Sequence, residues 1–144
     1  MIRMFTSADL KATSRLYVDV FAGPPWNERW TIDWALDRLT MIFQSPGFLG
    51  HVYEVNGKIV GVIAGRSNSF KGRRELEIVE LFVSKRCQSD GVGKALLSAI
   101  EEQAGNNGYS HSVLLTSQRV PAFNFYLRRG YRANADMVMM SRAL

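Results

Sequence analysis

The sequence predicts an α/β fold in which a mixed, mostly antiparallel sheet is flanked by about four helices. Three observations support this prediction. Asn56-Gly57 stands between two strand-like runs, and this pair is the strongest short hairpin signal because both central residues of a type I′ turn need positive φ. Apolar residues recur at helical spacing in several other segments. A strand-like run ending at Val83 breaks into a glycine loop, Gly91-Val92-Gly93, which opens a helix.

Before the hairpin we expect a short strand over residues 2–5 and then two helices. The first helix is capped by Thr or Ser at 6–7 and ends before Gly23-Pro24-Pro25. The second starts after Thr31, with an acidic residue in its first turn, where a negative charge suits the helix dipole. Ser45-Pro46-Gly47 ends it, because proline does not continue a helix.

Three strands of an antiparallel meander are expected next, over residues 48–55, 58–66 and 74–83. A polar loop joins the second to the third. In the third strand the inward alternation slips between Ile78 and Leu81, from even to odd positions. Such a slip indicates a β-bulge, which re-aims backbone groups and splays the neighbouring strands. We therefore expect the sheet to open at its middle strands.

After the glycine loop we expect a long helix over residues 92–106 and a short buried strand over 112–116. A further helix starts with a proline in its first turn and covers about 121–129. Residues 131–142 are expected to close the chain as one strand, or as two strands broken by a bend near Asn134.

The length of 144 residues suits one domain, residues 1–144, that buries about two thirds of its unfolded surface. No apolar run approaches the roughly 18 residues of a membrane span, and Met1 to Phe21 lacks the core of a signal peptide. We therefore expect a cytoplasmic protein with no membrane partner. The single Cys87 agrees with a reducing compartment. His51 and His111 are isolated in the sequence, so no metal site is expected.

The net charge of +5 suits nucleic acid, an acidic membrane or a polyanionic cofactor. Its distribution favours the cofactor, because Lys85, Arg86 and Lys94 bracket the glycine loop while the other basic residues are scattered. No nucleic-acid reader motif accompanies the charge, so we expect no nucleic-acid partner. A basic nucleic-acid-binding module is kept as an alternative.

The glycine loop itself predicts an anion site. A loop that opens a helix presents free backbone N–H groups, and the positive end of the helix dipole adds to them. The loop is not a Walker loop, which needs Gly at Gln88 and Ser or Thr at Ala95, nor a dinucleotide fingerprint, which needs Gly at Leu96. The pattern therefore favours a diphosphate-binding loop of another family.

Gln88-Ser-Asp-Gly91-Val-Gly93, between a strand and an amphipathic helix, resembles the acyl-coenzyme A motif of the GCN5-related N-acetyltransferases. The segment from Ala122 to Tyr131 resembles the second hallmark of that superfamily, a short helix ending in Tyr and followed by Gly and an aromatic residue. Together the two motifs cover about residues 76–131. The resemblance implies an N-acetyltransferase that moves an acetyl group from acetyl-coenzyme A to a primary amine of a small molecule or peptide by direct attack.

The resemblance also implies which backbone and loop groups bind the coenzyme. The oxyanion and the pantetheine amides would be bound by N–H groups of the bulged strand, and the diphosphate by the loop. These residues are Leu81, Phe82, Val83, Gln88, Ser89, Asp90, Gly91, Val92, Gly93 and Lys94. Asp90 departs from the family pattern, because a carboxylate beside a diphosphate lowers affinity.

Direct attack by an amine needs a base and an acid. Glu77 stands where histone acetyltransferases of this superfamily keep a catalytic Glu, whereas Glu80 lies nearer the expected opening. Either carboxylate, or water, remains a candidate base, and pairing with Arg66 or Arg74 across the strands is the alternative role for a Glu here. Tyr126 matches the family Tyr that protonates the leaving thiolate, as a phenol can at neutral pH.

In this superfamily the segment between the first two helices lines the acceptor site. Here it contains Trp26, Glu28 and Trp30, and aromatic rings with an acidic residue suit a cationic amine. Alternatively, the two Trp residues pack against the helix ends and do not bind the acceptor. The alternative hypothesis for the whole chain is a sensor that binds acyl-coenzyme A without catalysis. A homodimer is expected only by analogy, since dimers are common in the family.

Overall fold

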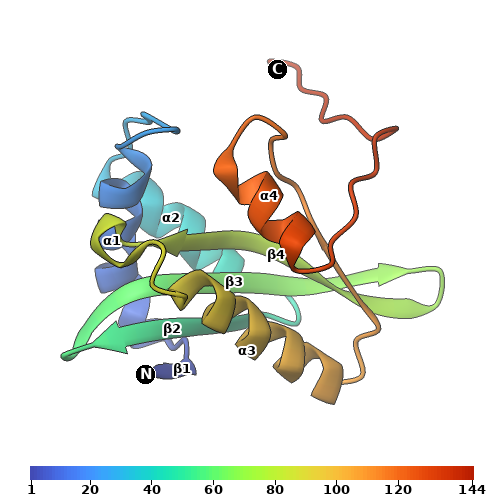
Figure 1. The fold of residues 1–144 in the computed structure, drawn as a ribbon, viewed down its shortest axis with the longest axis horizontal. Helices are drawn as coiled ribbons and strands as arrows, with labels where there is room; N and C mark the ends of the chain where they lie inside the picture. Colours follow the sequence, from blue (N-terminus) through green and yellow to red (C-terminus); the bar gives the residue numbers. More distant parts are fainter.

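A computed structural model describes all residues, 1–144, and shows a five-stranded sheet in the order β1-β2-β3-β4-β5 (Figure 1). The first four strands pair antiparallel and β5 pairs parallel to β4, so the predicted mixed, mostly antiparallel sheet is confirmed. The strands are β1 (Ile2–Met4), β2 (Leu49–Val55), β3 (Lys58–Phe70), β4 (Arg73–Val83) and β5 (His111–Leu114). The helices are α1 (Leu10–Phe21), α2 (Ile32–Phe43), α3 (Val92–Asn106) and α4 (Pro121–Arg128), with 3-10 turns at Ser7–Asp9 and Lys85–Cys87.

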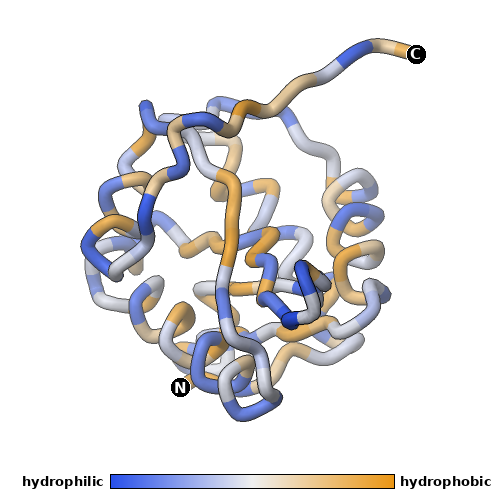
Figure 2. The backbone as a smooth tube through the Cα atoms, turned by 90° about the vertical axis from the view of Figure 1, so that its right-hand side faces the viewer, coloured by the Kyte–Doolittle hydropathy of each residue, from blue (hydrophilic) through white to orange (hydrophobic).

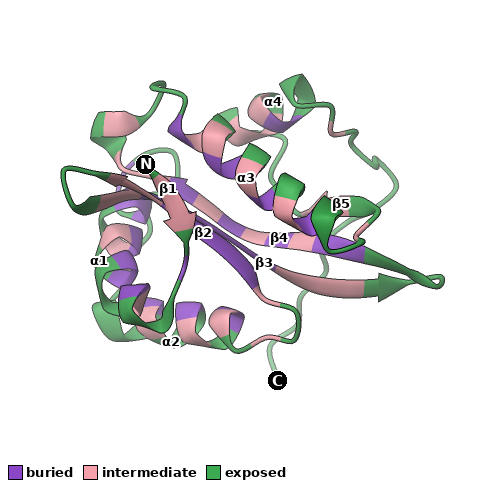
Figure 3. Cartoon of the chain, turned by 90° about the horizontal axis from the view of Figure 1, so that it is seen from below, coloured by how far each residue is buried: buried purple, intermediate pink, exposed green.

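Two helical layers cover the two faces of the sheet. α1 and α2 lie against one face, and α3 and α4 lie on the other side (Figures 1 and 3). Each layer closes its own apolar core. The first core joins both N-terminal helices to Val52, Val62, Ala64 and Phe82, and the second joins α3 and Tyr126 to Leu49, Ile63, Leu76 and Ile78. The sheet residues therefore divide between two cores according to the face on which they stand.

The predicted bulge is present in β4. Ala64 pairs with Glu80 and Gly65 pairs with Ile78, so Val79 has no partner residue on β3. Ile78 packs in the α3 core, whereas Val79 packs against the core of α1 and α2. Glu80 lies on this same α1 and α2 side, where it contacts both helices. The bulge thus puts two consecutive side chains on one face.

The sheet opens beside β4 as predicted. β5 pairs with β4 only from Glu75 to Ile78, so the edge of β4 from Val79 to Val83 has no strand beside it. After Leu114 the chain leaves the sheet and forms α4, which lies across this opening (Figure 1). The free edge of β4 therefore faces a space bounded by α4.

Two predictions for loops and termini were wrong. The polar loop expected between the second and third strands is instead the end of a longer β3, and the chain reverses at Lys71 and Gly72, both at positive φ. The closing strand expected over 131–142 is absent. A turn in which Met137 N–H donates to the Asn134 carbonyl redirects the chain, and the following run of Met and Val has no alternation that would select one face of a sheet. Figure 2 shows this segment leaving the body.

No helix combines the length and apolar character needed to cross a bilayer.

The bulge predicts a specific intolerance at Gly65. A Cβ added there would lie 2.8 Å from the Glu77 carbonyl oxygen and 2.8 Å from Leu76 Cδ1. We expect Gly65→Ala to lower the free energy of unfolding by about 1–3 kcal/mol, because the backbone at the bulge has to move. Gly105→Ala in α3 is the matched control: nothing lies within 4 Å of its added Cβ, and we expect a gain of about 0.5–1 kcal/mol. Urea denaturation measures the free energy of unfolding of both variants. Equal values would contradict the close backbone contact of Gly65 at the bulge.

Candidate functional site

The glycine loop ends in an unpartnered helix N-terminus. Ser89 and Gly91 both have positive φ, at 72° and 80°, and Gly91 caps α3 without any side-chain hydrogen bond. The N–H groups of Val92, Gly93 and Lys94 donate to no carbonyl in the protein. Free amides in a left-handed turn, at the positive end of a helix dipole, are a geometry that suits an anion.

Side chains of the loop region attach it to its neighbours. Gln88 Nε2 donates to the Val83 carbonyl over 3.1 Å, which ties the loop to the end of β4. Lys85 lies over Gly23, since a Cβ at that glycine would come within 1.8 Å of Lys85 Nζ. Its ammonium is therefore at the C-terminal end of α1, where helix carbonyls concentrate negative partial charge. The loop, β4 and α1 are held together at one end of the molecule.

A cavity of about 310 Å³ lies where these elements meet. Its wall brings together predicted site residues that are far apart in the sequence, namely Trp26, Leu81, Phe82, Val83, Gln88 and Tyr126. The rest of the wall comes from the end of α1, the Pro24-Pro25 segment and α4 from Pro121 to Arg128. The other predicted acceptor residues, Glu28 and Trp30, and both candidate bases lie outside this wall.

Glu80 is buried, with 7% of its surface exposed, between α1 and α2. Its Oε1 accepts from Arg38 Nε at 2.5 Å and from the Tyr17 hydroxyl at 3.4 Å. Burial raises the pKa of Glu80 above its ordinary value, and the charge and hydrogen bond of Arg38 oppose this rise without cancelling it. Burial and the nearby carboxylate also raise the pKa of Tyr17. Neither Arg38 nor Tyr17 was predicted from the sequence, because neither belongs to a motif.

Glu77 has a different environment. Its carboxylate pairs with Arg66 on β3, with Oε2 2.9 Å from Nε, and about a third of its side chain is exposed. Glu77 therefore has the cross-strand pairing with Arg66 that is the alternative to a role as base. Glu80 directly precedes the cavity-lining residues Leu81 to Val83, and its charge contributes to the raised pKa of Tyr126.

Tyr126 lies on α4 with 8% of its surface exposed. Its ring packs edge-on against Phe125 and Tyr131, at centroid distances of 5.2 and 5.5 Å, and no protein group hydrogen-bonds its hydroxyl. Burial and, to a lesser degree, the Glu80 charge raise the pKa of Tyr126 to about 12. The phenol therefore stays protonated at neutral pH and is free to donate.

The predicted acceptor residues divide between the cavity and the Glu80 cluster. Trp26 lines the cavity and packs on Phe21 at 5.6 Å between ring centroids. Trp30 packs edge-on against Tyr17 at 4.8 Å, and its Nε1 lies 3.5 Å from Glu28 Oε1. The charge of Glu28 adds to the raised pKa of both Tyr17 and Glu80, so this carboxylate belongs to the same electrostatic cluster.

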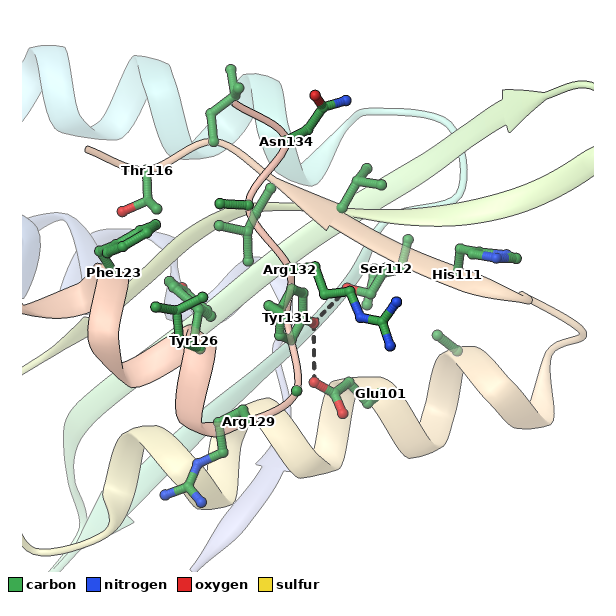
Figure 4. A pocket seen from close by; sticks show the side chains of 18 of the residues that line it. Glu101, His111, Ser112, Thr116, Phe123, Tyr126, Arg129, Tyr131, Arg132 and Asn134 are labelled. Atoms are coloured by element: carbon green, nitrogen blue, oxygen red, sulfur yellow. Dashed lines mark hydrogen bonds between the residues drawn. The ribbon is translucent and has the colours of Figure 1, made fainter. Parts of the chain in front are cut away.

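A larger cavity of about 750 Å³ lies on the other side of α4, along β5 and the end of α3 (Figure 4). Tyr126 lines both cavities. Here the Tyr131 hydroxyl lies 3.0 Å from Glu101 Oε1 and 2.7 Å from Ser112 Oγ, which ties the segment after α4 to α3 and β5. The predicted coenzyme and base residues do not reach this second cavity.

Comparisons with known proteins agree with this arrangement. Residues 26–140 match a family model described as an acetyltransferase (GNAT) domain. The chain is 30% identical to an uncharacterized N-acetyltransferase of Methanocaldococcus jannaschii, covering 92% of this chain and 78% of the relative. It is 28% identical to N-acetyltransferase 8B of Mus musculus, covering 81% of this chain but only 53% of that protein.

Among solved structures, an aminoglycoside acetyltransferase from an uncultured soil metagenomic sample, in complex with sisomicin, superimposes with a TM-score of 0.76. The match covers 100% of this chain and 95% of that chain at 19% identity, which supports the fold alone. The family model spans both hallmark segments, the glycine loop and α4. Taken with the splayed sheet and the free N-terminus of α3, this match shows that the chain belongs to the GNAT acetyltransferase family.

Proposed function

We propose that this chain is an acetyl-coenzyme A-dependent N-acetyltransferase that acts on a primary amine by direct attack, with residues 1–144 acting as one domain. One observation carries the proposal: a single cavity is lined by the unpaired end of β4, the glycine-loop residue Gln88 and the buried phenol of Tyr126. The β4 edge and Gln88 offer a site for the acyl carrier, Tyr126 supplies an acid, and Trp26 in the same wall leaves a place for the amine, which are three needs of thioester aminolysis.

The residues fit an acyl-coenzyme A ligand. The unpartnered amides of Val92, Gly93 and Lys94 suit the diphosphate. The free edge of β4 at Leu81 to Val83 suits the amides of an extended pantetheine arm, which would pair with it as a short strand does. When bound, acetyl-coenzyme A supplies an acyl carbon activated as a thioester. Among the loop residues, Asp90 opposes the diphosphate charge, which predicts modest affinity.

The protein groups then have separate roles. Glu80 serves as base, taking a proton from the acceptor ammonium through water, since its burial raises its pKa toward neutrality. Backbone N–H groups at the bulge stabilise the negative charge that develops on the acyl oxygen. Tyr126 serves as acid, donating its proton to the departing sulfur. Trp26, with Glu28 and Trp30 nearby, suits a cationic acceptor.

The first experiment is calorimetry with acetyl-coenzyme A, followed by measurement of thiol release on a panel of polyamines, aminoglycosides and peptides. The panel includes aminoglycosides because a structural neighbour is described as an aminoglycoside acetyltransferase. We expect binding and turnover with at least one amine. Binding without turnover on any amine would favour a coenzyme sensor, and no binding would refute the proposal.

Gly91 offers a test of the diphosphate site. With φ at +80°, an alanine there costs about 1–2 kcal/mol and turns the α3 amides away from their common target. We expect Gly91→Ala to raise the Kd for acetyl-coenzyme A by about tenfold or more in calorimetry. Gly72→Ala is the matched control, because Gly72 has a φ of +76° in the distant turn between β3 and β4. A similar loss of affinity in both variants would show that strain, and not the loop, is responsible.

Tyr126→Phe tests the acid role. We expect turnover to fall by about 10²-fold, because the thiolate then leaves without a proton donor, while the Kd for acetyl-coenzyme A changes by less than about twofold. Tyr131→Phe is a neighbouring control, since its hydroxyl bonds to Glu101 and Ser112 in the other cavity. Single-turnover thiol release measures both variants, and an unchanged rate in Tyr126→Phe would remove this residue from the mechanism.

A further inference from the structure

The hydrogen bonds around Glu80 are one-sided. Arg38 and Tyr17 both donate to Oε1, and no protein group donates to Oε2. Although Glu80 as a whole is buried, its Oε2 atom keeps some contact with solvent. One carboxylate oxygen is therefore fixed by the protein, while the other is free to exchange a proton.

We propose that Arg38 is a positioning residue for Glu80: the Nε of Arg38 fixes Oε1 of the buried carboxylate and favours its charged form, so that Oε2 takes the proton of the acceptor amine. This inference rests on the function proposed above, with Glu80 as its base. In the step, an O–H bond forms at Oε2 through one water as an N–H bond of the acceptor ammonium breaks. The electron pair of that N–H bond stays on nitrogen, which becomes able to attack.

The position of Arg38 follows from the sequence of α2. Ala35, Leu39 and Ile42 form the buried face of the helix, and Arg38 stands three residues after Ala35, at the edge of this face. About 43% of its side chain is exposed, so the guanidinium keeps part of its hydration while Nε reaches the carboxylate. A half-exposed Arg limits the desolvation cost that a fully buried ion pair would carry.

The other ionisable groups near Glu80 do not replace Arg38. Tyr17 from α1 donates one longer hydrogen bond, and Glu28, between α1 and α2, adds negative charge that opposes ionisation of Glu80. Tyr126 on α4 is neutral at the working pH. The charge of Arg66 on β3 is paired with Glu77. Arg38 is thus the nearby cation whose charge favours the ionised form of Glu80.

The test compares the pH dependence of kcat/KM in Arg38→Met, Arg38→Lys and Arg66→Met with that of the wild type. In Arg38→Met the acidic limb of the kcat/KM profile should move to higher pH by about one unit or more. The reason is that an opposite charge near a carboxylate lowers its pKa by about 1–3, and this variant removes that charge. The rate should fall on the acidic side of the shifted limb and recover at higher pH. Arg38→Lys keeps the positive charge without the planar guanidinium, so it should stay within about 0.5 pH unit of wild type with a lower rate.

Arg66→Met is the matched control, since it removes the corresponding cation from Glu77. It should leave the limb in place. A shift in Arg66→Met with none in Arg38→Met would make Glu77 the base and overturn the proposal, and so would an equal loss of rate at every pH in Arg38→Met. A carbon-13 NMR titration of the Glu80 carboxyl reports the same displacement without turnover, and an unchanged titration in Arg38→Met would also overturn it.

The experiments distinguish failure of the proposed function from failure of the proposed role of Arg38. If the wild type turns over no amine, the proposed function fails, and the role of Arg38 in it fails as well. If the wild type is active and its acidic limb does not depend on Arg38, the inference about this residue alone fails.

Discussion

The extra residue in β4 is the constraint on which the site depends. In a regular strand Glu80 would follow the alternation of Ile78 and stand in the apolar core beneath α3. The bulge at Val79 reverses the alternation, so that the carboxylate emerges between α1 and α2 while Leu81 and Val83 keep the α3 core closed. The same irregularity comes just where β5 stops pairing, at Ile78. The bulge thus places the carboxyl group of Glu80 between α1 and α2, at the point where the open edge of β4 begins.

The two titratable groups of the proposed mechanism have environments that suit opposite roles. Burial, and to a lesser degree the charge of Glu80, raises the pKa of Tyr126 to about 12, so this phenol keeps its proton available. Glu80 is also buried, but the guanidinium of Arg38 opposes the effect of burial and favours the charged form. An acid that retains its proton and a carboxylate that is still able to ionise are the pair that amine acetylation requires.

The sequence by itself determined the features that depend on neighbouring residues. The Asn56-Gly57 hairpin, the glycine loop ahead of α3 and the start of α4 at Pro121 are set by backbone preferences over a few positions. The bulge also left a local trace, because the slip in alternation between Ile78 and Leu81 lies within one strand. The two family hallmarks are short segments of the same kind, so the fold class and family were predictable from them.

Only the tertiary structure decided the surroundings of each candidate side chain. Arg38 and Tyr17 are 42 and 63 residues from Glu80 in the chain, and no local pattern connects them to it. Likewise, the pairing of Glu77 with Arg66 depends on the register of β3 against β4. Whether residues 131–142 form a closing strand depends on their pairing with an edge of the sheet, and they do not pair with one. Protonation and pairing follow from burial and from contacts between distant elements, and the sequence specifies these only through the complete fold.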